Sequence, residues 1–366
     1  MASGCRPAVT ASAPGRICLA GESLDWMTGD PSIVSAIPMR TTVTVYSSHR
    51  PGPVQLRAAA PLWMSRTTAV EQLGDYTGDE LDHLQASVRV VARRGARRLA
   101  GTVIESSTTL PIAAGVSSSA AVTVAAAAAL LLVADRTLPH PDTVATMAFR
   151  AESIELHTGA GWMDFLACTY GGVRQVFPGQ HPRAAKVADG IAVPIVLIDT
   201  GQRHCTARVL ASKRERFHAK EPGIRHYAHR APALVADMAA ALDTEHPDYP
   251  AIGALITRAH RLLADRVRCS TPLIEECITR CLTAGAYGAK VSGSGHGGCL
   301  FALVGWDALE PVRAALAELP VRVTVFTASD AHGVVFLPAD HQNDKGTTHA
   351  GPGHIDQGVR HPRTGR

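Results

Sequence analysis

Apolar residues along the chain follow two kinds of spacing, one typical of strands and the other typical of helices. Short alternating or continuous apolar segments predict strands at residues 16–20, 40–47, 54–59, 101–107, 173–177, 193–199, 289–291, 300–304 and 321–326. Apolar residues three and four positions apart predict helices over residues 80–98, 119–135 and 141–157, and helices are expected to dominate residues 231–284. This mixture of strands and helices contains no internal repeat.

The length of the chain and its glycine and proline clusters indicate two lobes and a tail. A chain of 366 residues suits two domains of ordinary size. A stretch rich in proline, glycine, histidine and arginine at residues 178–183 is the predicted boundary, so we expect one lobe over residues 1–182 and a second over residues 183–339. Few apolar side chains occur in residues 340–366, which predicts a disordered tail.

Composition narrows the class of protein. An apolar fraction of 46%, a charged fraction of 19% and a net charge of +4 are typical of a soluble globular protein. Residues 1–16 contain no apolar stretch of signal-peptide length, and the alanine-rich run at residues 120–134 is shorter than the roughly 20 residues that span a bilayer. The arginine-rich stretch at residues 91–98 could bind phosphate or nucleic acid, but an exposed helix end explains it better. We therefore expect neither a membrane nor a nucleic-acid partner.

The eight cysteines are scattered and include no Cys-x-x-Cys pair. Cys277 and Cys281 lie one helical turn apart, which in a cytosolic chain most often means two buried thiols. A metal site there would need nearby histidine or cysteine partners that the sequence does not supply. The cysteine pattern therefore predicts a reduced, cytoplasmic protein.

The segment Leu110-Pro-Ile-Ala-Ala-Gly-Val-Ser-Ser-Ser-Ala-Ala121 connects a predicted strand to a predicted helix. Unpaired backbone N–H groups at the start of a helix, together with the helix dipole, attract phosphate oxygens. Gly115 permits a positive φ and the close approach of a ligand, and residues 117–119 add three serine hydroxyls that can bond phosphate or reach a magnesium ion. The absence of Gly-Lys-Ser/Thr excludes a Walker-type loop. Taken alone, the segment is explained equally well by serines that only cap the helix.

Two further segments change this interpretation. One, near the N-terminus, is Ala13-Pro-Gly-Arg-Ile-Cys-Leu-Ala-Gly-Glu-Ser-Leu-Asp25, and the other, near the C-terminus, is Lys290-Val-Ser-Gly-Ser-Gly-His-Gly-Gly-Cys299. In order and spacing, the three segments resemble the three signature motifs of the galactokinase, homoserine kinase, mevalonate kinase and phosphomevalonate kinase (GHMP) superfamily. The triple serine is closest to the galactokinase form of the second motif, which points to the sugar-kinase-like branch. A plain turn explains the four glycines among residues 293–298 less well than a loop that closes on an active site.

The resemblance implies an α+β fold in two lobes, the first like domain 2 of ribosomal protein S5 and the second ferredoxin-like. It implies ATP and Mg²⁺ as cofactors, with Ser119 and Glu152 as the magnesium ligands. A hydroxyl and a carboxylate suit magnesium, which usually keeps several waters. The alternative for Glu152 is a solvent-facing carboxylate on a helix. The nucleotide-binding residues that the resemblance implies are Ala113, Ala114, Gly115, Val116, Ser117, Ser118, Ser119, Gly293 and Gly295.

The same resemblance assigns two catalytic residues. Asp164, shortly before a Gly-Gly pair, matches the aspartate that would accept or orient the proton of the attacking hydroxyl. Arg16 matches an arginine that lies beside this aspartate in sugar-kinase relatives, where it favours the ionised carboxylate and steadies charge on the transferred phosphoryl group. The plain alternatives are a helix N-cap for Asp164 and a surface ion pair for Arg16.

The acceptor-binding residues that the resemblance implies are Glu22, Ser23, Asp25, Gly161 and Asp164. Glu22 and Asp25 match positions that hydrogen-bond sugar hydroxyls in galactokinase-like members. Ser23 replaces the usual histidine of the family, which argues against galactose itself.

Three other residues are candidates for the acceptor pocket. Trp26 stands where an aromatic such as tyrosine is common in the family. Trp162 could form a pocket wall or lie in the core, and His204 could face the cleft or the surface.

These features predict an ATP-dependent phosphotransferase with an alcohol acceptor, namely a sugar kinase acting on a monosaccharide or a close relative, with the anomeric hydroxyl among the candidate positions. The alternative acceptors are an inositol-type polyol, an amino alcohol or a mevalonate-like acid. Acids are usually met by lysine or arginine, and only Arg16 and Arg40 are near the first motif, which favours a neutral polyol. A third hypothesis, a catalytically inactive ligand sensor, is disfavoured by the four catalytic and magnesium residues. We expect a monomer or homodimer whose partners are ATP and the small alcohol.

Overall fold

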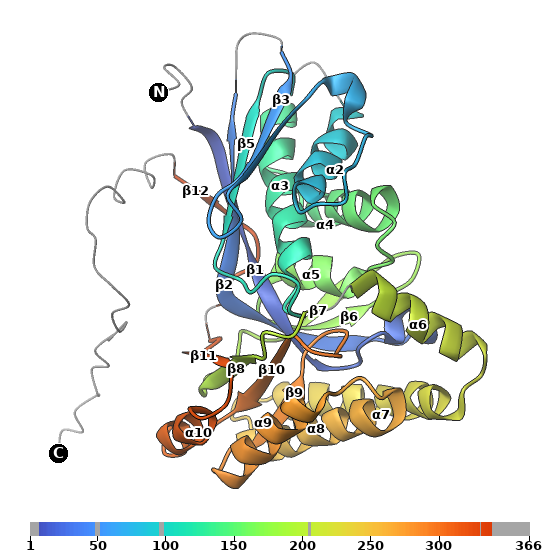
Figure 1. The fold of residues 1–366 in the computed structure, drawn as a ribbon, viewed down its shortest axis with the longest axis vertical. Helices are drawn as coiled ribbons and strands as arrows, with labels where there is room; N and C mark the ends of the chain where they lie inside the picture. Colours follow the sequence, from blue (N-terminus) through green and yellow to red (C-terminus); the bar gives the residue numbers. More distant parts are fainter. Residues whose placement is uncertain (1–6, 48–51, 95–98, 204–205, 330, 339–366) are drawn as a thin grey trace, which may run out of the picture.

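A computed structural model describes residues 7–47, 52–94, 99–203, 206–329 and 331–338. Two β-sheets form the framework, and helices cover them (Figure 1). The strands are β1 (Pro7–Ala20), β2 (Ser32–Tyr46), β3 (Val54–Ala58), β4 (Met64–Thr68), β5 (Val103–Thr108), β6 (Val173–Phe177), β7 (Arg183–Ala188), β8 (Ile195–Asp199), β9 (Gly288–Val291), β10 (Cys299–Leu303), β11 (Arg322–Phe326) and β12 (Val335–Leu337). The α-helices are α1 (Leu24–Met27), α2 (Leu81–Ala92), α3 (Ser118–Asp135), α4 (Pro141–Phe149), α5 (Trp162–Tyr170), α6 (Thr206–His218), α7 (Pro222–Leu242), α8 (Tyr249–Leu262), α9 (Pro272–Thr283) and α10 (Leu309–Leu316).

The larger sheet is organised around the long neighbouring strands β1 and β2. Its order is β12-β1-β2-β5-β3-β4, and β6 and β7 extend it beside β2. β2 is long enough to pair with two strands in turn, β6 through residues 32–35 and β5 through residues 41–46. All of these pairings are antiparallel except that of β3 with β5. The end of β1, residues 16–20, pairs with residues 33–36 of β2, which places Arg16 beside the middle of the larger sheet.

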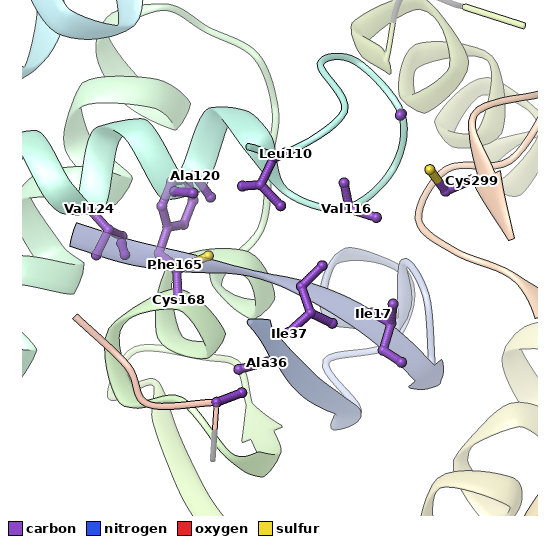
Figure 2. Close-up of a cluster of buried hydrophobic side chains, with 14 of the residues drawn as sticks. Ile17, Ala36, Ile37, Leu110, Val116, Ala120, Val124, Phe165, Cys168 and Cys299 are labelled. Atoms are coloured by element: carbon purple, nitrogen blue, oxygen red, sulfur yellow. The ribbon is translucent and has the colours of Figure 1, made fainter. Parts of the chain in front are cut away.

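The alanine-rich helix α3 fills the core beneath this sheet. It packs against β1, β2, α2 and α4, and a helix that is apolar on all sides is expected to be buried. By length and composition alone it could cross a membrane, but 67% of it is buried within the fold, as in core helices. The loop before it is anchored in the same core, where Leu110 and Val116 join Ile17 and Ile37 in one cluster of buried side chains (Figure 2).

The smaller sheet has the order β11-β8-β10-β9, and all of its neighbouring strands are antiparallel. Helices α6 to α9 connect β8 to β9, and α10 connects β10 to β11. This is the β-α-β-β-α-β arrangement of a ferredoxin-like lobe, as predicted. Continuous apolar runs make β8 and β10 fully buried. Cys277 and Cys281 on α9 are buried free thiols, which confirms that prediction.

Two short strands fall outside the lobe that the sequence prediction assigned to them. β7 pairs with β6, and β12 pairs with β1, so both belong to the larger sheet although they lie within residues 183–339. The chain thus returns to the first lobe at β12. We accordingly propose a boundary between β7 and β8, in place of the one at residue 182, with β12 assigned to the first lobe. The predicted tail, residues 340–366, lies outside the described residues.

Candidate active site

A cavity of about 440 Å³ brings the three sequence motifs together. Val116 and Gly295 do not line it, because the Val116 side chain is in the core and Gly295 packs against Cys269. The predicted site residues that do line it are Arg16, Glu22, Ser23, Asp25, Ala113, Ala114, Gly115, Ser117, Ser118, Ser119, Glu152, Gly161, Asp164 and Gly293.

The backbone carbonyl of Gly115 is the point where the three motifs meet. Its oxygen accepts hydrogen bonds from Arg16 Nη1 at 2.7 Å and from Ser292 Oγ at 3.0 Å. The loop is held on its other side by the backbone N–H of Cys299, which donates to the Ala114 carbonyl at 2.7 Å. The first and third motifs therefore fix the position of the second through hydrogen bonds to its backbone.

Gly115 has no room for a side chain. Its φ is +79°, in the left-handed region, and a Cβ atom there would lie 2.4 Å from the Ser292 carbonyl oxygen. Gly293, with φ of +76°, faces Gly115 in turn, because a Cβ there would lie 2.8 Å from the Gly115 Cα. Two glycines are needed here because two backbones are in contact, which explains the pairing of glycine-rich segments seen in the sequence.

Arg16 forms a buried ion pair with Asp164. Its Nε lies 2.8 Å and its Nη2 2.6 Å from the same oxygen, Oδ1 of Asp164, so Oδ2 takes no part in this ion pair. Burial lowers the pKa of the Arg16 guanidinium, but the charge and hydrogen bond of Asp164, together with two neighbouring thiols, outweigh this effect, so the net pKa lies above its ordinary value. The surface alternative for Arg16 is wrong, since the side chain is only 4% exposed. The capping alternative for Asp164 is wrong as well, because the N-cap of α5 is Gly161.

The start of α3 presents serine hydroxyls to the cavity. Ser117 occupies the N-cap position with φ of +62°, yet its hydroxyl makes no capping hydrogen bond. That hydroxyl is buried and has no hydrogen-bond partner among the described residues. Serines that only cap the helix would bond its N–H groups, so this alternative does not describe Ser117.

Ser119 and Glu152 are brought together as predicted. The Ser119 hydroxyl donates to Glu152 Oε1 at 2.8 Å, while Oε2 is buried without a partner in the described part of the chain. Burial raises the pKa of the Glu152 carboxyl, and the charge of His83 and the Ser119 hydrogen bond oppose that rise. Glu152 is not solvent-facing. The predicted helix over residues 141–157 changes at Arg150–Glu155 into a π-helical turn, a feature that often occurs at functional sites.

Glu22 lines the cavity but is also tied to a lysine that the sequence analysis left without a role. Its Oε1 pairs with Lys290 Nζ, which also donates to the carbonyls of Cys18 at 3.0 Å and Val291 at 2.8 Å. All three protons of this fully buried ammonium group are therefore engaged. Glu22 Oε2 is buried and has no hydrogen-bond partner among the described residues.

Asp25 lies against the glycine break that precedes α5. A Cβ atom on Gly161 would lie only 1.3 Å from Oδ2 of Asp25. Because glycine has no Cβ, the carboxylate can lie directly against the Gly161 backbone. Burial and the neighbouring Asp164 charge raise the pKa of Asp25 to about 6, and a hydrogen bond from the backbone N–H of Trp26 and the charge of Arg214 oppose the rise only in part.

The aromatic wall of the cavity is Trp26. Trp162 instead stacks on Phe149 with ring centroids 3.9 Å apart and packs in the core, so its core alternative holds. His204 lies outside the described residues. Arg40 donates to the carbonyls of His332 and Gly333 and does not line the cavity.

Helix α6 contributes to the site although no helix was predicted there. Leu210 lines the cavity, Lys213 donates to the Ser294 carbonyl at 2.8 Å, and Arg214 donates to the Gly159 carbonyl at 2.7 Å. The sequence did not show the helical spacing of apolar residues, because a lysine occupies position 213. This position is buried, and in an amphipathic helix it would normally carry an apolar residue. Glu80 and His83 of the α2 region were also missed, since nothing near them in the sequence marks them as site residues.

The sequence of this chain is similar to those of known kinases. A model of the GHMP kinases N terminal domain matches residues 82–172, and one of the GHMP kinases C terminal matches residues 238–321. A mevalonate kinase from Aeropyrum pernix is 30% identical over 303 residues, which cover 81% of this chain and 89% of that kinase. The chain belongs to the GHMP kinase family. A galactokinase from Mycobacterium tuberculosis is 26% identical over 331 residues, covering 82% of this chain and 90% of that enzyme.

The fold of this GHMP kinase agrees with the same assignment. The crystal structure of Lactococcus lactis galactokinase complexed with galactose superposes with a TM-score of 0.75 at 18% identity, covering 90% of this chain and 95% of that one. The predicted two-lobed α+β fold is therefore confirmed. Membership of the GHMP kinases makes the protein a phosphotransferase of a family that uses ATP, and its relatives include both mevalonate kinases and galactokinases.

Proposed function

We propose that the protein transfers the γ-phosphoryl group of ATP to a hydroxyl of a monosaccharide or sugar derivative. The observation that carries this proposal is the junction at which Arg16 holds both Asp164 and the Gly115 carbonyl. One guanidinium thereby links the predicted base for the acceptor hydroxyl to the loop predicted to hold the phosphates. Phosphoryl transfer depends mainly on positioning and charge stabilisation, which is what this junction supplies.

The nucleotide phosphates are assigned to the start of α3. The helix begins at Ser118, and its first N–H groups together with the helix dipole favour an anion there. The unpartnered hydroxyl of Ser117 supports the assignment, since a buried hydroxyl without a hydrogen bond is costly unless a ligand completes it. A small adjoining pocket shares Ser118 and Ser119 with the cavity and includes the apolar side chains of Leu62 and Val122, so we assign the nucleotide base to its mouth.

The magnesium assignment passes a test of fit. Glu152 Oε2 is a buried carboxylate oxygen without a partner in the described residues, and the Ser119 hydroxyl lies 2.8 Å from the other oxygen. Magnesium accepts such oxygen donors and is commonly held by one or two carboxylates with phosphate oxygens and water. Bound there, the ion would neutralise charge on the phosphate oxygens. The described residues contain no cluster of three or more metal-binding side chains, which suits magnesium better than a metal that needs a protein-only cage.

The acceptor hydroxyl is assigned to the free oxygen of Asp164. Because Arg16 bonds only Oδ1, the second oxygen can accept a hydrogen bond from a hydroxyl and receive its proton as the new O–P bond forms. Arg16 fixes the direction of this carboxylate through its two contacts with Oδ1. A catalytically inactive ligand sensor would not need a carboxylate that is oriented in this way beside the phosphate loop.

Electrostatics at the acceptor end favour a sugar over a mevalonate-like acid. Lys290 pairs with Glu22 at this end, and its three protons are engaged by Glu22 and two carbonyls. Asp25 carries an additional carboxylate. A substrate carboxylate about 4 Å from Asp25 would cost about 4 kcal/mol at an effective dielectric of 20. Hydroxyl groups meet the same carboxylates as hydrogen-bond donors without this repulsion.

An acceptor screen tests the proposal. The purified protein with MgATP is presented with hexoses, sugar derivatives, inositols, amino alcohols and mevalonate, and ADP release is measured. We expect turnover on at least one sugar or sugar derivative, with the phosphorylated position identified by phosphorus NMR. Exclusive turnover of mevalonate would contradict the sugar assignment, and no turnover with tight sugar binding would favour the sensor.

A further inference from the structure

The acceptor end of the cavity holds polar atoms that the protein itself leaves unsatisfied. Glu22 Oε2 and Trp26 Nε1 are buried and have no hydrogen-bond partner among the described residues, and both side chains line the cavity. Buried polar groups are nearly always paired in native structures, so such atoms mark where a ligand binds. The carboxylate oxygen needs a donor, and the indole N–H needs an acceptor.

Asp25 adds a carboxylate that has no ion pair in the described part of the chain. The charged groups that act on it are Asp164 and Arg214, and the first outweighs the second. Arg214 is engaged elsewhere, since it donates to the Gly159 carbonyl and lies over the Trp26 ring, 5.2 Å from its centroid. Asp25 is held against Gly161, which limits how far it can turn away from the cavity.

The nearby lysines cannot supply the missing positive charge. Lys290 faces Glu22 Oε1 with all three of its protons engaged. Lys213 is buried and donates to the Ser294 carbonyl, and burial lowers its pKa, so its own charge is disfavoured. Arg16 is paired with Asp164. The acceptor end is therefore left with one carboxylate, Asp25, that lacks a direct counter-ion among the described residues.

We propose that the acceptor carries a protonated amine, with Asp25 as its counter-ion and Glu22 Oε2 as a second hydrogen-bond acceptor. An amino sugar or aminocyclitol has this chemistry: an ammonium group for the carboxylates, a hydroxyl for Asp164, and further oxygens that can accept from the Trp26 N–H. A charge-assisted hydrogen bond to a partly buried carboxylate is stronger than one from a neutral hydroxyl. The inference rests on the proposed sugar-kinase function and narrows its substrate class.

The test compares matched acceptors. D-glucosamine, D-galactosamine, D-mannosamine and 2-deoxystreptamine are assayed with MgATP, beside the parent hexoses and the N-acetylated hexosamines. We expect kcat/KM for the best amine to exceed that of its parent and its N-acetyl form about tenfold or more. A ratio of one or less, with hexoses turned over, overturns the inference and leaves the sugar-kinase proposal intact. No turnover of any amine or sugar overturns both.

A variant assigns the effect to Asp25. In Asp25→Asn the amine-to-parent ratio should fall to about one, whatever the absolute rates, and in the exposed control Asp237→Asn on α7 it should not change. An unchanged ratio in Asp25→Asn overturns the assignment of Asp25. If Asp25→Asn does not fold, the pH dependence of the wild-type enzyme tests the role of Asp25. Its amine-to-parent ratio should fall as the pH drops from about 6.5 to 5, a range in which the hexosamine stays protonated while Asp25 takes up a proton. A ratio that is constant over this range contradicts the inference.

Discussion

Replacing Asp25 by asparagine should stabilise the ligand-free protein, although it removes a residue that we assign to substrate binding. Asp25 is partly buried, lies against the Gly161 backbone and shares the cavity with the Asp164 carboxylate. Folding therefore brings an ionised carboxylate out of water and close to a like charge. Asparagine keeps the shape and the hydrogen-bonding oxygen but removes the charge.

The magnitude follows from the pKa. Burial and the Asp164 charge raise the pKa of Asp25 from 3.8 to about 6, and each pH unit corresponds to 1.36 kcal/mol. A carboxyl with a raised pKa destabilises the fold only where it is ionised in the unfolded chain. The penalty is therefore absent below the unfolded value, grows as the pH rises from 3.8 to 6, and is complete above it. The gain from Asp25→Asn should be about 3 kcal/mol at pH 7.5 and about 1 kcal/mol at pH 4.5.

Urea unfolding of the wild type and of Asp25→Asn at the two pH values measures this difference. Asp237→Asn, an exposed change on α7, serves as the control and should shift neither curve. A variant that is less stable than the wild type at pH 7.5, or a gain that is the same at both pH values, would refute the reasoning. Either result would mean that Asp25 is stabilised by charges or hydrogen bonds that the structure does not show.

Other substitutions test other parts of the site. Lys290→Met should lower the free energy of unfolding by about 3–5 kcal/mol, because it leaves Glu22 buried without its partner, and the added change Glu22→Gln should restore part of that loss in the same urea experiment. Glu152→Gln should raise the Mg²⁺ concentration needed for half-maximal ADP release about tenfold, and an unchanged magnesium dependence would remove Glu152 from the metal site. Gly115→Ala should cost about 2 kcal/mol or more of stability and raise the KM for ATP, since its Cβ would meet the Ser292 carbonyl and its φ is positive. Wild-type stability and KM in Gly115→Ala would show that the loop can move freely.

The loop before α3 could be predicted from the sequence, because its glycine and serine residues stand between a predicted strand and a predicted helix. Its interpretation as a phosphate site needed the two other glycine-containing segments as well. The continuous apolar runs of β8 and β10 likewise identify buried strands without further information. Short strands at the edge of a sheet were harder to predict. β7 and β12 are only partly buried and were not predicted, since the partners that define them lie elsewhere in the chain.

The acceptor end depends on contacts between distant residues, so its sequence pattern was incomplete. Lys290 stands 268 residues from Glu22, and nothing local indicates that the two are paired. Arg214 and Lys213 come from α6, whose apolar spacing is broken by a buried lysine. The resemblance to sugar kinases identified Glu22 and Asp25 as site residues. Only the fold shows that Lys290 neutralises Glu22, whereas Asp25 has no ion pair among the described residues.

The most direct test of the central claim is phosphoryl transfer by Asp164→Asn. Phosphorus NMR follows the γ-phosphoryl group of ATP in the presence of magnesium and the best acceptor from the screen, and the KM for ATP is measured in parallel. We predict that kcat falls about 10²–10³-fold, with a KM for ATP that changes little, since Asp164 acts on the acceptor hydroxyl and not on the nucleotide. A variant that phosphorylates the acceptor as fast as the wild type would contradict the account.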